Sequence, residues 1–271
     1  MKSISSYSTL VLVTIGVFAN FVACGSKMYQ VSVEKDVDPA LISEDATNIN
    51  SPNYGIHATA GWSELPIRFK TSEQLSEDQL LGLNRAIETW EIAVGQDLFL
   101  YEGADARTGD TFNDLYSSLE DFENGHYLDQ NWSKTGKPEM VLATTIWDNS
   151  RIDANAIQTA DIRFNAENYE IGDSLVLFDA PANKEIVDME TLALHELGHL
   201  LGLSHVDPDI DPESIMNPSI FIGAGLYSRS VSKGDIERIQ RIYDCMGDAC
   251  DVEVVYLEIL QRVANPEYSA H

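Results

Sequence analysis

The sequence predicts an α+β fold in which a twisted, five-stranded mixed sheet packs against helices. Short runs alternate apolar and polar residues, as half-buried strands do, and longer runs repeat an apolar residue every three or four positions, as helices do. The length of the chain, 271 residues, predicts one folded domain of ordinary size, with a leader and a tail. The runs with strand character are Leu65–Lys70, Leu98–Tyr101, Glu139–Trp147, Thr159–Asn165 and Asp173–Phe178. No element is predicted for residues 105–138, where His126 is expected to be solvated or hydrogen-bonded.

Four helices are expected beside the sheet. The first begins at Ser76, because Ser76 and Gln79 have the spacing of a capping box and an apolar stripe follows them. The second ends at Gly202, since glycine adopts the left-handed backbone conformation that ends a helix without steric cost. The third begins at Ser232, which an acidic residue follows three positions later. A short terminal helix is expected over Val252–Val263.

The segment His195–His205 carries the residues that predict the chemistry. His195 and His199 are four residues apart, so on a helix both imidazoles lie on one face and reach one metal ion. A turn at Gly202 reverses the chain and can bring His205 back as a third ligand. Three neutral imidazoles leave one coordination position open, which is typical of a catalytic zinc site rather than a closed structural one.

Glu196 lies next to the first histidine, about 100° around the helix. Its carboxylate can therefore flank a zinc-bound water as general base and then general acid, instead of binding the metal. The competing interpretation is an ordinary amphipathic helix with solvated histidines. The addition of Gly202 and His205 to the five-residue core makes a chance match rare, so we predict one catalytic Zn²⁺.

The motif His-Glu-x-x-His-x-x-Gly-x-x-His over His195–His205, followed by Met216 in Ser214–Pro218, resembles the metzincin metalloproteases. Among metzincins, the chain is similar to the matrixins, including their bacterial members, over roughly residues 62–243. The resemblance implies a metzincin-like catalytic domain with an active-site helix and a C-terminal helix. It also implies that Met216 lies beneath the three imidazoles as an apolar floor.

The resemblance carries further expectations about the surroundings of the cleft. The edge strand that orders an extended substrate would be Ser174–Ala180, and the loop Ser219–Ser230 would wall the specificity pocket. Matrixins hold a second, structural zinc, which is expected to be absent here because no histidine lies between Asp161 and His195. They also commonly bind structural calcium, so Ca²⁺ is a second cofactor to consider.

These features predict a zinc-dependent metalloendopeptidase that hydrolyses peptide bonds of extracytoplasmic proteins, with a protein or peptide as substrate. The alternative is a catalytically silent surface binding protein that retains the fold. Glu196 discriminates between them, because a binding protein does not need a carboxylate beside an open zinc position. Metal storage or transfer predicts more ligands than the six histidines and three cysteines of this chain.

Acidic residues outnumber basic residues by 44 to 17, which gives a formal net charge of −27. This charge argues against a nucleic-acid-binding surface and against electrostatic attachment to anionic lipid. Most of it is expected on solvated faces. A cluster that could also hold calcium contains Asp207, Asp209, Asp211 and Glu213.

Residues 1–23 have the character of a lipoprotein signal peptide. The apolar stretch Thr9–Phe18 is too short to span a membrane as a helix, and Phe21–Cys24 resembles a bacterial lipobox, whose cysteine carries the lipid. We therefore expect an exported protein of the bacterial cell envelope, anchored through Cys24 to the outer membrane or the cell surface. Residues 24–60 are expected to form a flexible tether or a short pro-segment.

A lipid on Cys24 leaves Cys245 and Cys250, which would then form one disulfide that closes a short loop. Pairing of Cys24 with one of the two, or free thiols, are the open alternatives. The catalytic domain is expected over residues 61–245 and a C-terminal tail over residues 246–271. The protein is expected to be a monomer.

Overall fold

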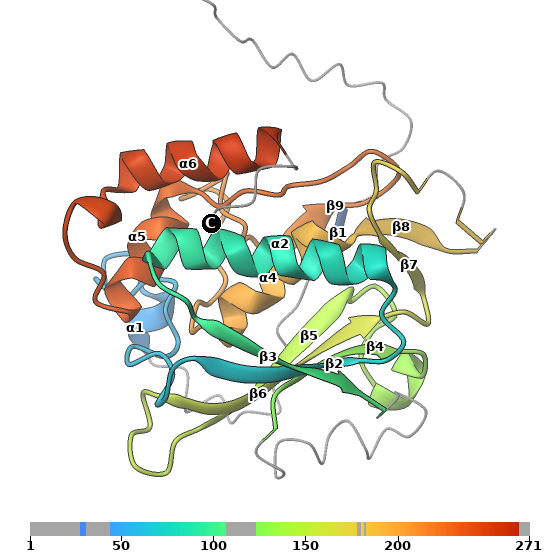
Figure 1. Cartoon of the computed structure of the whole chain (residues 1–271), viewed down its shortest axis with the longest axis horizontal. Coiled ribbons are helices and arrows are strands. Elements are labelled where there is room, and N and C mark those ends of the chain that lie inside the picture. The colour runs from blue at the N-terminus through green and yellow to red at the C-terminus, as the bar shows by residue number, and fades with distance from the viewer. Residues whose placement is uncertain (1–27, 31–43, 107–122, 178–179, 182, 266–271) are drawn as a thin grey trace, which may run out of the picture.

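One five-stranded sheet with two helices on the same face forms the framework of the molecule (Figure 1). Neighbouring strands are parallel except at one edge, where β5 runs antiparallel to β6. The predicted α+β fold with a five-stranded mixed sheet is therefore confirmed. Across the sheet the order is β3 (Phe99–Asp105), β2 (Ile67–Ser72), β4 (Gly125–Asp129), β6 (Ile157–Asn165) and β5 (Ala143–Asn149).

The computed structural model describes residues 28–30, 44–106, 123–177, 180–181 and 183–265. The expected signal peptide and the expected lipid-bearing Cys24 lie outside these ranges. Within them, no helix combines the length and the apolar character that crossing a membrane requires.

The fifth strand of the sheet is not the one that the sequence predicted. It is β4, which lies in the region where no element was expected, whereas the described part of Asp173–Phe178 forms a turn. The backbone amides of residues 175–177 all donate to the carbonyl or the carboxylate of Asp173, at 2.9–3.1 Å. One aspartate thus satisfies three amides locally, which competes with pairing to a neighbouring strand.

Two pairs of short strands lie outside the main sheet. β7 (Tyr169–Gly172) pairs in parallel with β8 (Glu185–Asp188), and β1 (Met28–Gln30) pairs antiparallel with β9 (Ser219–Phe221). β1 belongs to the expected tether or pro-segment, so this part of it lies beside the loop that follows Met216.

Helices α2 (Glu77–Val94) and α4 (Met189–Leu200) form the layer on the sheet (Figure 1). Every residue of α4 is buried. The indole nitrogen of Trp90 on α2 donates to the carbonyl of Leu194 on α4 at 2.9 Å, so a side chain of one helix hydrogen-bonds to the backbone of the other. α4 is thus the central helix of the domain.

Two helices begin with the N-terminal caps that the sequence predicted. The Ser76 hydroxyl accepts from the amide of Gln79, and the Gln79 side chain accepts in turn from the amide of Ser76. Ser232 and Asp235 form the same reciprocal pair at the start of α5 (Lys233–Ile242). In both cases two amides that the helix cannot satisfy find a side-chain partner.

Residues 44–60 pack on the domain, although they were expected in the tether. They include a short helix, α1 (Glu44–Thr47), and the buried side chains of Ile56 and Ala58. Ile56 also forms an isolated antiparallel bridge with Leu203, just after α4. Apolar burial and backbone pairing thus begin within the segment expected to form the tether or short pro-segment, before residue 61.

The domain also continues beyond the boundary predicted at residue 245. A disulfide joins Cys245 to Cys250, which closes a loop containing the 3-10 helix η4 (Asp248–Cys250). The loop leads into α6 (Val252–Ala264), the predicted terminal helix, which packs on α2 and α5. Another 3-10 helix, η3 (Trp132–Thr135), follows β4.

The imidazole of His126 on β4 is buried, and neither of its nitrogens hydrogen-bonds to a described residue, contrary to the expectation. Its ring stacks on that of Phe69, with 4.9 Å between the ring centroids. Burial lowers the pKa of His126 to about 3, so the imidazole is neutral at physiological pH. The His126 ring therefore packs in the core as an aromatic side chain.

Candidate active site

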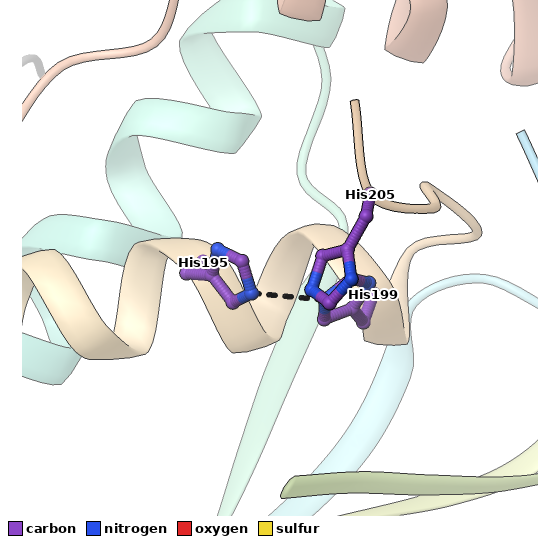
Figure 2. A group of neighbouring side chains, drawn as sticks. All are labelled: His195, His199 and His205. Carbon is purple, nitrogen blue, oxygen red and sulfur yellow. Dashed lines mark hydrogen bonds between the residues drawn. The ribbon is translucent and has the colours of Figure 1, made fainter. Parts of the chain in front are cut away.

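Three imidazoles converge near the C-terminal end of α4 (Figure 2). The helix presents His195 and His199 from one face, and the loop after it brings His205 to them. One nitrogen of each ring lies within 4.8 Å of the other two. The structure therefore brings together the three side chains that the sequence predicted as zinc ligands.

Gly202 makes the turn that returns the third histidine to the helix. Its amide donates to the carbonyl of His199 at 3.0 Å, and the amide of Leu203 donates to the carbonyl of Gly198 at 2.9 Å. These two bonds and a φ of +110° at Gly202 define a Schellman turn, as predicted for this glycine. A Cβ atom there would also lie only 2.9 Å from the carbonyl oxygen of Ala58. Only glycine fits this position without strain.

Backbone carbonyls determine which ring nitrogen carries the proton in two of the histidines. Nδ1 of His195 lies 2.7 Å from the carbonyl of Ile215, and Nδ1 of His199 lies 2.8 Å from that of Leu203. A carbonyl only accepts, so each Nδ1 must donate, and in a neutral ring each Nε2 then keeps a free lone pair. The two Nε2 atoms face each other at 3.0 Å with no proton between them.

This arrangement fits a bound cation. Two lone pairs at 3.0 Å repel each other, and a shared metal ion would remove the repulsion. Tetrahedral zinc with bonds of about 2.0–2.1 Å separates its ligand nitrogens by roughly 3.4 Å, close to the spacing seen here. His205 supplies a third buried nitrogen, Nε2, that has no hydrogen-bond partner among the described residues. The donor set and its orphaned nitrogens therefore suit Zn²⁺.

The three imidazoles are in the neutral form that metal binding requires. Burial lowers the pKa of His195 to about 3 and that of His205 to about 4, and the neighbouring His205 ring adds to the effect on His195. The pKa of His199 also lies well below its ordinary value of 6.5, again chiefly through burial. No proton has to leave these rings before a metal binds at neutral pH.

The two carboxylate oxygens of the buried Glu196 have different surroundings. Oε2 accepts a hydrogen bond of 2.6 Å from the hydroxyl of Thr145, whereas Oε1 has no partner among the described residues. Burial raises the pKa of Glu196 to about 8, against the opposing effects of the Thr145 hydrogen bond and the positive charge of Lys137. A carboxyl group with a pKa near neutrality is suited to taking up and returning a proton.

Met216 contacts α4 between the first two histidines. It is fully buried, and a Cβ atom on Gly198 would lie 2.4 Å from the Met216 sulfur, so glycine at this position allows the contact. The amide of Val206 donates to the Met216 carbonyl at 3.0 Å, and the adjacent Ile215 carbonyl accepts from His195. The methionine turn thus supports the ligands through both packing and hydrogen bonds.

Comparison with known proteins agrees with this geometry. Residues 113–244 match the family model of the matrixins. Among curated proteins, Metalloendoproteinase 5-MMP of Arabidopsis thaliana is 43% identical over 58 residues, and Metalloendoproteinase 2-MMP of the same organism is 44% identical over 57. The part of the chain that carries the three histidines is therefore matrixin-like. Each alignment covers 21% of this chain but only 15% and 14% of the two relatives, respectively.

In this matrixin-like domain, the strand beside the active-site helix is β5. The prediction that Ser174–Ala180 forms the edge strand over the cleft is wrong, because residues 174–177 belong to no strand. β5 contacts α4, and its Thr145 bonds to Glu196. Among the described strands, β5 pairs only with β6, so it is the edge strand on this side of the sheet, and its residues 143–147 are buried.

Two residues that sequence reasoning did not assign support the end of the active-site helix. The ring nitrogen Nε2 of His57 donates to the carbonyl of His199 at 2.8 Å, and the indole of Trp62 donates to that of Leu200 at 2.7 Å. His57 also stacks on Trp147, with 4.1 Å between the ring centroids. Both bonds satisfy carbonyls in the last turn of α4. No local sequence pattern identifies residues that act over such separations.

Within the described residues, the histidine trio is the only group of histidine, cysteine or acidic side chains with metal-binding geometry. In the acidic cluster that follows His205, Asp211 accepts hydrogen bonds from Arg238 at 3.0 Å and from Ser232 at 2.7 Å. Calcium binding by this matrixin-like domain stays a prediction.

Proposed function

We propose that this protein is a zinc-dependent metalloendopeptidase that hydrolyses peptide bonds of extracytoplasmic proteins. The single observation that carries the proposal is the convergence of three neutral imidazoles on one point with the buried Glu196 carboxyl adjacent on the same helix. His195, His199 and His205 would hold the ion. Zn²⁺ bound there would polarise the peptide carbonyl and lower the pKa of the attacking water.

Glu196 supplies the proton transfers that hydrolysis needs. Its carboxylate takes a proton from water as the water oxygen bonds to the carbonyl carbon of the peptide. When the carbon–nitrogen bond breaks, the same carboxyl group returns this proton to the leaving amine. No covalent intermediate with the protein forms, so the site does not require a nucleophilic serine or cysteine.

The edge of β5 that no described strand pairs with is the proposed binding site for the substrate backbone. A peptide that adds to this edge as a further strand lies along the strand that contacts α4. Backbone hydrogen bonds of this kind favour extended segments and are largely independent of side-chain identity. The proposed substrates are therefore unfolded or loop segments of proteins.

A catalytically silent binding protein is the second candidate, because it would keep the same three histidines. The buried Glu196 disfavours it. A protein that only binds has no need of a buried carboxyl group beside the three histidines.

Removal of the metal tests the proposed function directly. We expect the full chain to contain about one zinc per molecule and to cleave casein, and we expect 1,10-phenanthroline to abolish cleavage until Zn²⁺ is restored. Thermal unfolding should shift to lower temperature in parallel, since the ion binds only the folded state. The control is the same incubation with Zn²⁺ in excess over the chelator. Full cleavage by chain shown to be free of metal would contradict the proposal.

The lipid anchor at Cys24 and the resulting location at the bacterial cell surface are likewise proposals, supported by the sequence pattern of residues 1–24. In a bacterial host, the wild-type chain is expected in the membrane fraction and a Cys24→Ala variant outside it. Equal distribution of the two between membrane and soluble fractions would refute the anchor. We also propose that the protein acts as a monomer.

A further inference from the structure

We propose that Thr145 is a positioning residue that holds the Glu196 carboxyl group in its catalytic orientation, an inference that rests on the proposed function. Thr145 lies on β5, 51 residues before Glu196 in the sequence. Its hydroxyl lies 2.6 Å from Glu196 Oε2 and 3.1 Å from the backbone carbonyl oxygen of the same residue. The contact therefore joins the proposed peptide-binding strand to the proton-transferring residue.

The contact determines which carboxylate oxygen is free to act. A threonine hydroxyl has one proton, and the shorter distance assigns it to Oε2. Oε1 then stays buried without a partner among the described residues. With Oε2 fixed and Oε1 unpartnered, one oxygen anchors the side chain and the other is left for proton exchange.

A structural role alone does not explain the hydroxyl. Thr145 is fully buried on a strand, where the isosteric valine would pack as well without a polar atom to satisfy. The neighbouring Thr144 is also fully buried on β5, and its hydroxyl has no hydrogen-bond partner among the described residues. Side chains of successive strand residues point to opposite faces, so only Thr145 reaches α4.

Kinetics of three variants of the full, zinc-loaded chain test the proposal. We expect Thr145→Val to lower kcat by about 10-fold to 100-fold with KM within about twofold of wild type, because a small displacement of a catalytic group slows chemistry without weakening binding. Thr145→Ser keeps the hydroxyl and should restore kcat to within about threefold. The matched control is Thr89→Val, which removes a buried hydroxyl on α2 that bonds only to the Arg85 carbonyl of its own helix, and it should leave both constants within about twofold. A kcat for Thr145→Val equal to that of wild type, or an equal loss in Thr89→Val, would overturn the proposal.

A double-mutant cycle in urea unfolding gives a readout that does not depend on activity. With zinc at one saturating concentration, Thr145→Val should lower the unfolding midpoint more in the wild-type background than in the Glu196→Ala background, where the acceptor is missing. Thr89→Val should shift the midpoint equally in both backgrounds. Additive effects at Thr145 would show that the contact is not made. A wild type that binds zinc without cleaving casein would contradict the proposed function, and the cycle would still decide whether Thr145 holds Glu196.

Discussion

Replacement of Glu196 by alanine is expected to lower kcat for casein-derived peptides by roughly 10²-fold to 10⁴-fold, the usual contribution of a general acid–base group. Zinc content should stay at about one per chain, because the three histidines are untouched. The matched variant is His205→Ala, which removes a ligand and keeps the carboxyl group. It should lose both zinc and activity, so the two roles separate in one pair of measurements.

The same replacement is expected to raise the stability of the metal-free protein at neutral pH. The pKa of the Glu196 carboxyl is about 8 in the folded chain against an ordinary value of 4.5. The unfolded chain therefore releases this proton first, and stability falls as pH rises from 4.5 toward 8. Alanine removes that penalty. Unfolding in urea at pH 7.5 measures it, and a Glu196→Ala variant that is less stable and keeps wild-type kcat would contradict both the burial argument and the catalytic role.

Local signals in the sequence were sufficient to predict the three histidines of the proposed zinc site and most of the helices and strands. The spacing of His195 and His199, the glycine at Gly202, and the caps at Ser76 and Ser232 each involve residues within a few positions of one another. Each of these patterns predicts a structure through local backbone geometry alone, so it can be recognised in a single sequence. For this reason these three helix ends and the grouping of the three histidines were predictable from the sequence.

Two elements were misassigned, β4 and the segment Asp173–Phe178, and each has its own physical cause. All five residues of β4 are buried, so the strand has no alternation of apolar and polar residues that could reveal it. Leu175 and Val176 do show apolar character, but the Asp173 turn leaves them exposed. Burial on both sides of a strand and local capping by an aspartate are decided by tertiary contacts and side-chain hydrogen bonds, and a periodicity analysis registers neither.

The same limit applies to the residues that support the site. Thr145, His57 and Trp62 reach α4 from segments at least 51 residues away in the sequence. Nothing near them in the sequence signals this role, and the polar composition of residues 44–60 instead suggested a tether. Zinc ligands on one helix are a local pattern, whereas the side chains that orient them are not.

Arg229→Met is expected to destabilise the folded protein by about 3–5 kcal/mol, the usual effect of removing one partner from a buried ion pair. Arg229 bonds to both carboxylate oxygens of Asp188, with its Nε at 3.0 Å from Oδ2, and also pairs with Asp173. Asp188 is the N-terminal cap of α4. Without the guanidinium, two carboxylates lose their countercharge at the start of the active-site helix.

The pH dependence of this effect separates it from a loss of packing. Burial alone would raise the pKa of Asp188, but the hydrogen bonds and charge of Arg229 outweigh it and place the pKa below its ordinary value of 3.8. The stabilisation that the Arg229–Asp188 pair gives the folded state is therefore complete above pH 3.8. It is lost as the pH falls through the lower pKa that Asp188 has in the folded state. The difference in unfolding free energy between wild type and Arg229→Met should be full at pH 7 and shrink in acid.

An exposed ion pair of the same chain supplies the control for this measurement. Lys233 bonds to Glu253 on the surface, and Lys233→Met should lower stability far less than Arg229→Met because solvent screens both charges. If both variants lost the same small amount of unfolding free energy at pH 7, the buried pairs of Arg229 with Asp188 and Asp173 would not stabilise α4. A large, acid-sensitive loss confined to Arg229→Met would show that the helix carrying the zinc ligands depends on a charge held in the interior.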